Sequence, residues 1–307
     1  MDRATESHLP DVSQERVPAK HAQILDWVGM SGIELPLLWT VGSYSLALPA
    51  KVEAGVSLIQ PEAKGIHMSR LYREVQAQMG NSPLSWDQLQ LVMSEFQKSH
   101  AELSDQYFLS AEFAIPLQRE SLKSSLKGWR TYPVKVSAQK TSSGEIKASL
   151  EVVVTYSSTC PMSAALSRQL IQENFKKSFA QKDFDLKDVY DWLGTTEGVI
   201  ATPHAQRSFA KLKIWSSQLD PVFWIDLIER ALPTPVQTVV KREDEQEFAL
   251  RNGQNLMFCE DAARRLQAAL RELPNDLLQG FEGEVRHAES LHPHDAVARF
   301  SQAFTSN

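Results

Sequence analysis

Apolar and polar residues alternate along several stretches of the chain, a pattern typical of strands with one buried face. The clearest pair covers residues 131–140 and 146–156, joined by a connection that contains Gly144. Glycine readily takes the positive φ angle that a tight turn needs, so these residues predict a β-hairpin. Further strands are predicted at residues 52–59, 208–215 and 284–292.

Other stretches repeat apolar residues every three or four positions, as amphipathic helices do. One of them places Leu71, Val75 and Met79 on a single helical face. Strands and helices follow each other without regular βαβ alternation, which predicts an α+β fold with an antiparallel sheet. The helices are predicted at residues 69–79, 83–96, 221–231 and 260–273.

A weak internal similarity between the two halves of the chain predicts two modules. Each half has a hairpin and a pair of helices, and the modules would cover residues 33–156 and 157–307. The opening residues 1–32 are polar and contain prolines, so they are interpreted as a flexible or loosely docked arm.

Composition excludes several classes of protein. The 307 residues are 42% hydrophobic, enough for a core, and their net charge of -6 provides no broad cationic surface for nucleic acid or anionic lipid. No stretch approaches the roughly 18 to 20 consecutive apolar residues of a membrane span. Two cysteines cannot form a disulfide framework, and the N-terminus lacks the pattern of a signal peptide. A cytoplasmic protein is therefore expected.

Cys160 stands out because it follows Ser-Ser-Thr and precedes Pro161, at the end of the predicted hairpin. This composition is typical of exposed backbone rather than of a core. Its thiolate is a candidate metal ligand or nucleophile. The other cysteine, Cys259, lies in a helical stretch and is interpreted as a packed, small apolar residue.

Three polar clusters in the second half could complement Cys160. A thiolate, imidazoles and a carboxylate make a mixed donor set that suits zinc, iron or manganese. Taken singly, each cluster has an ordinary explanation, such as a surface histidine or a solvated helix start. The spacing alone therefore does not establish a metal site. The clusters are residues 202–208, 241–245 and 289–294.

Within the last cluster, His292 and His294 would share one face of a strand. Pro293 between them indicates an edge or a strand end, where only one histidine needs to point inward.

Motifs spread over nearly the whole chain resemble, in the same order, those of the type IB GTP cyclohydrolase I family. They are KGIHMSRL at 64–71, STCPMS at 158–163, HAQRS at 204–208, VKREDE at 240–245, FCED at 258–261 and ESLHPH at 289–294, with LPDV at 9–12 resembling the family's start. The resemblance implies a tunnelling fold, in which tandem antiparallel β-sheet modules carry helices on one face. It also implies a homotetramer with active sites at subunit interfaces.

The same resemblance implies hydrolysis of GTP to formate and 7,8-dihydroneopterin triphosphate, the first step of tetrahydrofolate biosynthesis. The implied metal ligands are Cys160, His204, Glu245 and His292, for zinc, manganese or iron. A divalent ion lowers the pKa of bound water to about 7, which suits attack at C8 of guanine. Glu260 is the implied purine anchor and, with Cys160 and His204, completes the expected catalytic set.

Glu260 would accept hydrogen bonds from guanine N1–H and the N2 amino group, and this contact selects guanine over adenine. The triphosphate needs cations, and the nearest candidates within matching motifs are Lys64, His67, Arg70 and Arg207.

Two features depart from the family's pattern. Between Cys160 and His204 lie 43 residues where the family usually has a short spacer, which predicts a helical insertion near residues 165–200. The usual asparagine after the histidine is Ala205, which removes a polar contact but not a ligand.

Two other functions remain open from the sequence. In a tunnelling-fold nitrile reductase, Cys160 would be a covalent nucleophile and NADPH the hydride donor, but Glu245 and His292 would then have no role. A non-catalytic paralogue that binds a pterin or purine is the second alternative, and the four intact candidate ligands count against it.

Overall fold

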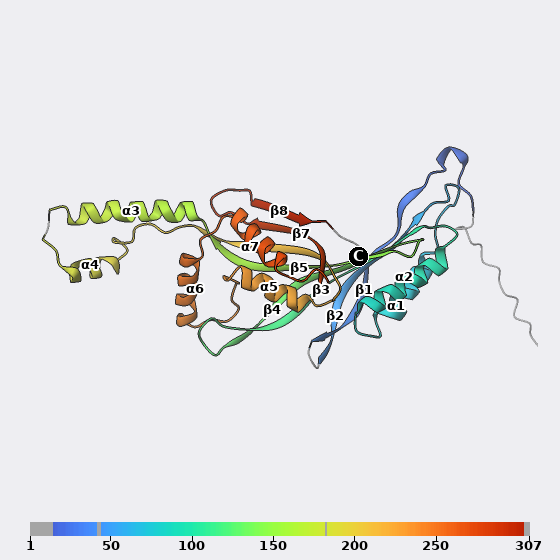
Figure 1. Cartoon of the computed structure of the whole chain (residues 1–307), viewed down its shortest axis with the longest axis horizontal. Coiled ribbons are helices and arrows are strands. Elements are labelled where there is room, and N and C mark those ends of the chain that lie inside the picture. The colour runs from blue at the N-terminus through green and yellow to red at the C-terminus, as the bar shows by residue number, and fades with distance from the viewer. Residues whose placement is uncertain (1–14, 42–43, 182, 304–307) are drawn as a thin grey trace, which may run out of the picture. The chain divides into compact units, whose positions relative to one another are not determined.

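The computed structural model of the chain describes residues 15–41, 44–181 and 183–303. Its strands form an eight-stranded sheet in which each strand lies beside the next one along the chain. The pairs β1/β2, β2/β3 and β7/β8 are antiparallel. This arrangement of antiparallel strands and helices confirms the predicted α+β class (Figure 1).

The strands are β1 (Leu25–Val41), β2 (Tyr44–Leu58), β3 (Gln106–Glu120), β4 (Lys127–Thr141), β5 (Ile146–Thr159), β6 (Ala205–Ser216), β7 (Leu278–His287) and β8 (Ala296–Gln302). The helices are α1 (Met68–Met79), α2 (Trp86–His100), α3 (Pro161–Phe179), α4 (Leu186–Leu193), α5 (Pro221–Ala231), α6 (Arg242–Gln254) and α7 (Cys259–Arg271). A short 3-10 helix, Ala19–His21, precedes β1.

Most elements predicted from the sequence are confirmed. The predicted hairpin is β4 and β5, and Gly144 in its turn has φ +91°. The four predicted helices are α1, α2, α5 and α7. The strand predicted at 284–292 is wrong in its second half, because β7 ends at His287 and a connection precedes β8. Pro293 lies in that connection and has no N–H for a ladder.

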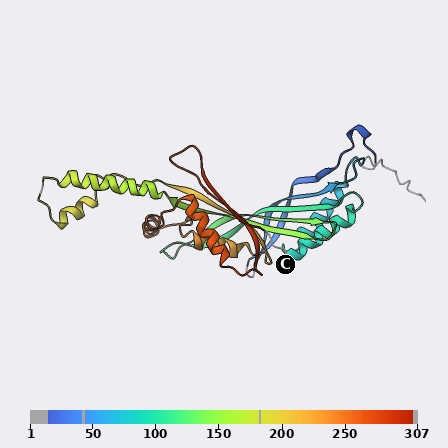
Figure 2. The same ribbon diagram turned by 45° about the horizontal axis from the view of Figure 1, so that its top comes forward.

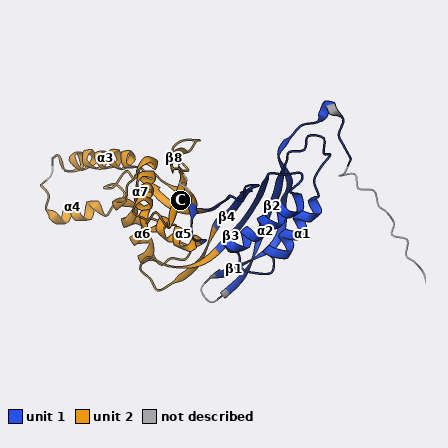
Figure 3. Cartoon of the chain, turned by 45° about the vertical axis from the view of Figure 1, so that its right-hand side comes forward, with its two compact units in different colours: residues 1–115, 133–151, 215–219 blue, residues 116–132, 152–214, 220–307 orange. Residues whose placement is uncertain are grey.

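The chain forms two compact units, shown in different colours in Figure 3. Unit 1 extends to Ile115 and includes residues 133–151 and 215–219, and unit 2 contains the remaining residues. Strands β3 to β6 each contribute residues to both units. The module boundaries inferred from the sequence stay a prediction. Of the predicted arm, residues 1–14, including LPDV, lie outside the described residues.

In unit 1, helices α1 and α2 pack together, and α1 contacts β1 and β2 (Figure 1). The predicted apolar stripe of α1, formed by Leu71, Val75 and Met79, is fully buried. Alternate residues of β2 such as Val52 and Val56 are also fully buried. Side chains repeat every 3.6 residues along a helix and every 2 residues along a strand. The apolar stripe of α1 and one face of β2 therefore both point into the same core.

In unit 2, α7 packs against α5 and against β7 and β8. Figure 2 shows α5 and α7 over one face of this part of the sheet. Leu266 and Leu270 of α7, Ile225 of α5 and Val285 of β7 are buried. Three candidate site residues of unit 2 lie at the N-terminal ends of helices, Cys160 at α3, Glu245 in α6 and Glu260 in α7.

Between Cys160 and His204, helices α3 and α4 extend away from the sheet of unit 2 (Figures 1 and 2). Few of their side chains are buried, and α4 has no buried residue. Four aromatic residues hold the two helices together, with ring centroids 4.8–6.0 Å apart, so the pair has a small apolar cluster of its own. They are Phe175, Phe179, Phe184 and Trp192.

Candidate active site

Cys160 is the N-cap residue of α3, directly after β5 ends at Thr159. Its Sγ accepts a weak contact from Ser163 N at 3.5 Å, and Pro161 begins the helix, where a missing N–H costs no intrahelical bond. The residue is half-buried. The positive end of a helix dipole interacts favourably with negative charge, so this position suits a thiolate.

His204 lies beside Cys160 although 43 residues separate them in the chain. The Cys160 N–H donates to the His204 carbonyl at 3.2 Å, and His204 N–H donates to Ser163 Oγ at 3.1 Å. These two bonds hold the segment before β6 against the start of α3. Two of the four predicted metal ligands are therefore brought together.

The imidazole of His204 lies among polar partners that sequence reasoning missed. Gln206 Oε1 lies 3.0 Å from His204 Nδ1, and Gln206 Nε2 donates to Ser158 Oγ at 3.0 Å and to Glu289 Oε1 at 3.4 Å. Glu289 Oε2 is 3.9 Å from the same ring nitrogen. A signal was available, because Gln206 and Glu289 stand inside the motifs at 204–208 and 289–294.

Glu245 lies in the first turn of α6 and is exposed. The preceding residue, Asp244, is fully buried and fixes this turn. Its carboxylate accepts hydrogen bonds of 2.6–2.9 Å from Lys241 N, from Ser124 N and Oγ, and from Lys123 N. Burial alone would raise the pKa of Asp244, but these bonds together hold it well below its usual range.

His292 is exposed in the connection between β7 and β8, and its ring stacks on that of His294 with centroids 5.1 Å apart. The expectation that the two rings share a strand face is wrong, because this segment is not a strand. Among the described residues, no group of three or more His, Cys, Asp or Glu side chains lies close enough to hold a metal ion. The structure thus joins Cys160 with His204 but does not add Glu245 or His292 to them.

Glu260 is exposed in the first turn of α7. The Cys259 thiol donates to Glu260 Oε2 at 3.4 Å, and burial, together with this hydrogen bond, raises the pKa of Cys259 to about 11. The buried position of Cys259 confirms its interpretation as a packed residue, and its protonated thiol stabilises the carboxylate of Glu260.

A buried pair lies near Glu260. Tyr156 Oη and His287 Nε2 are joined by a hydrogen bond of 2.8 Å, and both side chains are almost completely buried. Burial lowers the pKa of His287 to about 4, although Glu260 partly opposes the shift. Burial, and after it Cys259, raises the pKa of Tyr156. The pair is therefore neutral at pH 7, and sequence reasoning missed it.

Three of the four candidate phosphate ligands lie in unit 1. His67 and Arg70 line a cavity of about 690 Å³, together with residues that include Lys98 and His100. Lys64, nearby in sequence, forms an ion pair with Glu15 at 2.5 Å. Arg207 belongs to β6 in unit 2, where it is exposed.

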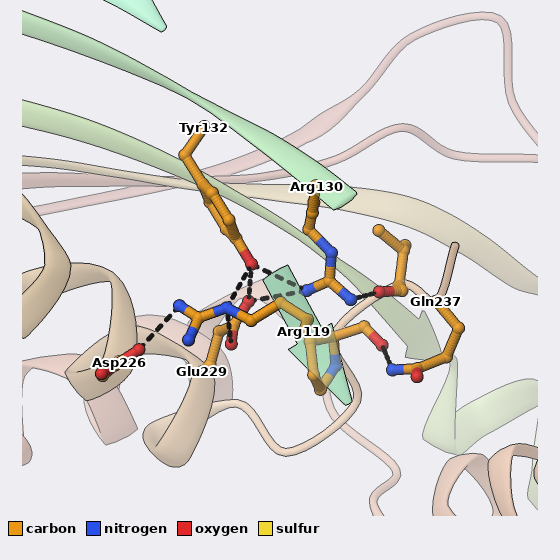
Figure 4. A network of polar contacts seen from close by, with 8 residues as sticks. Arg119, Arg130, Tyr132, Asp226, Glu229 and Gln237 are labelled. Carbon is orange, nitrogen blue, oxygen red and sulfur yellow. Dashed lines mark hydrogen bonds and ion pairs between the residues drawn. The ribbon is translucent and has the colours of Figure 1, made fainter. Parts of the chain in front are cut away.

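A network of polar side chains in unit 2 joins β3 and β4 to α5 (Figure 4). Glu229 Oε1 accepts from Arg130 at 2.6 Å and from the hydroxyl of Tyr132 at 2.5 Å. Arg119 donates to Asp226 at 2.7 Å and to the Tyr132 hydroxyl at 3.0 Å. Burial, with Glu229 second, raises the pKa of Tyr132 to about 12. No motif in the sequence indicated this network.

The helices in the described ranges include none that is long and apolar enough to cross a membrane.

A solved structure shares the fold. The crystal structure of a hyper-thermostable uricase mutant matches with a TM-score of 0.50 and 7% identity, over 90% of this chain and 91% of that chain. Because the identity is so low, the match shows the fold alone. This structural match confirms the tunnelling fold that the sequence resemblance implies.

A family model described as Type I GTP cyclohydrolase folE2 matches residues 9–298. A GTP cyclohydrolase FolE2 of Bdellovibrio bacteriovorus is 51% identical over 300 residues, covering 97% of each chain. Its counterpart in Hydrogenovibrio crunogenus is 49% identical, covering 89% of this chain and 88% of the relative. The counterpart in Pseudoalteromonas translucida is 45% identical, covering 94% of this chain and 96% of the relative. The extent of these matches shows that the chain belongs to the type I GTP cyclohydrolase FolE2 family.

Proposed function

We propose that this chain hydrolyses GTP to formate and 7,8-dihydroneopterin triphosphate, the first step of tetrahydrofolate biosynthesis. Relatives named GTP cyclohydrolase FolE2 share 45–51% of its residues over almost its whole length. The structural observation that carries the proposal is the meeting of Cys160 and His204 across the chain reversal at α3 and α4. A main-chain hydrogen bond joins these two residues, and cysteine and histidine are residue types that hydrolytic metal centres use as ligands.

We propose that a divalent ion, zinc, manganese or iron, is bound by Cys160, His204, Glu245 and His292. The pair that meets in one chain fits such an ion, because sulfur and imidazole nitrogen suit borderline metals. Glu245 and His292 do not join this pair within the described chain. We propose that a second copy supplies them, in a homotetramer with active sites at subunit interfaces.

When bound, the divalent ion supplies an activated water for attack at C8 of guanine. Glu260 binds the opposite edge of the base by accepting hydrogen bonds from N1–H and the N2 amino group. A carboxylate has about four lone-pair positions, so Glu260 can accept from guanine while it also accepts from Cys259. The chain thus orients the purine through α7, a separate helix from that capped by Cys160.

We propose that Lys64, His67, Arg70 and Arg207 bind the triphosphate. The cavity of about 690 Å³ beside His67 and Arg70 has room for a polyphosphate. Acidic residues, Glu15 among them, also line this cavity. A bound phosphate would therefore have to displace Glu15 from its ion pair with Lys64.

Both cysteines are free thiols in the structure, and a reducing cytoplasm is the compartment that the proposal implies.

The proposal is tested by following GTP, formate and pterin after chelation and after addition of zinc, manganese or iron. We expect chelated protein to be inactive and the added metal to restore turnover. Cys160→Ser should lose metal and activity together, whereas the matched variant Cys259→Ser should keep its metal content. Turnover by metal-depleted wild-type protein would refute the metal mechanism.

Thiol alkylation separates the proposal from covalent catalysis. As a metal ligand, Cys160 should resist alkylation until a chelator removes the ion. Immediate alkylation in the metal-loaded protein, together with NADPH oxidation, would instead support the nitrile reductase.

A further inference from the structure

Gln206 is the first buried residue of β6, two positions after His204, with 8% of its surface exposed. A buried amide has to satisfy its donors and its acceptor within the protein. Gln206 does so among three polar side chains, those of His204, Ser158 and Glu289. These partners therefore fix the orientation of the Gln206 amide group.

Glu289 determines the orientation of that amide. A carboxylate offers only acceptors, so the amide group that lies 3.4 Å from Glu289 Oε1 has to be the NH₂ of Gln206. The same NH₂ donates to Ser158 Oγ at 3.0 Å, and Ser158 in turn shares a hydrogen bond of 2.7 Å with Ser208. Ser158 and Ser208 are fully buried, so these contacts have no competition from water. The amide oxygen is left to face His204.

The amide oxygen then determines the tautomer of His204. Gln206 Oε1 can only accept, and it lies 3.0 Å from His204 Nδ1, so Nδ1 has to carry the ring proton. A neutral imidazole protonated on Nδ1 presents its lone pair on Nε2. Nε2 is therefore the nitrogen that can bind an electrophile or a cation.

We propose that Gln206 is a positioning residue which, held by Glu289, keeps His204 in its Nδ1–H tautomer and so prepares Nε2 for a divalent cation. The inference rests on the proposed function only where it takes His204 as a metal ligand. Outer partners of this kind orient ligating histidines, and their loss typically costs about 10-fold to 100-fold in metal affinity.

The tautomer is measured directly on metal-free, full-length wild-type protein labelled with ¹⁵N-histidine. Two-bond ¹⁵N–¹H spectra distinguish a protonated from an unprotonated ring nitrogen, and His204→Gln assigns the signals. We expect His204 to carry its proton on Nδ1. In Gln206→Leu, which removes the acceptor, we expect a mixture of tautomers. A wild-type ring protonated on Nε2, or a Gln206→Leu spectrum unchanged from wild type, would overturn the proposal.

Metal affinity provides the second measurement, with Zn²⁺ added to metal-free protein in competition with a chelator. Gln206→Leu should bind Zn²⁺ about 10-fold to 100-fold more weakly. Ser216→Ala, at a buried position near the other end of β6 where the serine accepts from Gln218 N, is the matched control and should keep wild-type affinity and tautomer. An equal loss in both variants would overturn the positioning role, since it indicates general damage to the strand.

The experiments distinguish failure of the proposed metal mechanism from failure of the proposed His204 tautomer. If the wild-type protein binds no Zn²⁺ while His204 holds the Nδ1–H form, the proposed metal mechanism fails and the tautomer assignment stands.

Discussion

Replacing His287 with glutamine should change how the stability of the protein depends on pH. His287 lies on the buried face of β7 with 2% of its surface exposed, and it is hydrogen-bonded to Tyr156. Burial, and after it Cys259, raises the pKa of Tyr156, whereas Arg265 lowers it. Glu260 acts in the raising direction on the pKa of His287. Burial dominates and lowers the pKa of His287 to about 4. The folded state therefore requires a neutral ring.

The magnitude follows from proton linkage. In the unfolded chain a histidine has a pKa of about 6.5, so between pH 6.5 and 4 the unfolded state binds more protons than the folded state. Stability is thus fully present above pH 6.5 and is lost as the pH falls toward 4. The loss attributable to His287 is about 2 kcal/mol at pH 5 and about 3 kcal/mol at pH 4.

Urea unfolding at several pH values, followed by circular dichroism, measures this effect. His287→Gln should be less stable than wild type at pH 7, because it loses the packed ring, but it should lose about 2 kcal/mol less between pH 7 and 5. His294→Gln removes an exposed histidine and is the matched control, expected to follow wild type. A His287 that titrates near pH 6.5 by NMR, or equal pH slopes in wild type and His287→Gln, would refute the reasoning.

Three further substitutions test other parts of unit 2. Glu229→Ala should cost about 3 to 5 kcal/mol of unfolding free energy, because it removes the carboxylate partner of the buried Arg130 and of the half-buried Arg119. Asp191→Asn, in an exposed ion pair, should cost less than about 1 kcal/mol. Equal losses in urea unfolding would contradict the network. Glu260→Ala should weaken GTP binding in calorimetry and leave metal content intact, and unchanged selectivity for guanine would exclude the anchoring role. Asp244→Asn should lose less stability in acid than wild type, since a carboxyl with a lowered pKa stabilises above its ordinary pKa and stops doing so once protonated; equally steep acid unfolding would argue against this account.

The sequence by itself determined the elements whose signals are local. The hairpin of β4 and β5 follows from alternation and one glycine, and α1 follows from an apolar residue on each turn. These patterns depend only on residues a few positions apart, because the side-chain period of a helix or a strand is the same in any fold. β8 was not predicted, because its residues are only partly buried and give no strong alternation. The family was recognisable because its motifs are long and keep their order.

Only the tertiary structure decided which distant groups meet. Cys160 lies beside His204 because α3 and α4 return the chain to the start of β6, and no spacing in the sequence specifies that return. Glu229 meets Arg130 from 99 positions away, and Gln206 meets Glu289 from 83 positions away. Such contacts depend on where whole elements pack, and a buried polar group takes whatever partner that packing brings within reach. For that reason the sequence predicted the chemical types of the site residues but not their hydrogen bonds or protonation states.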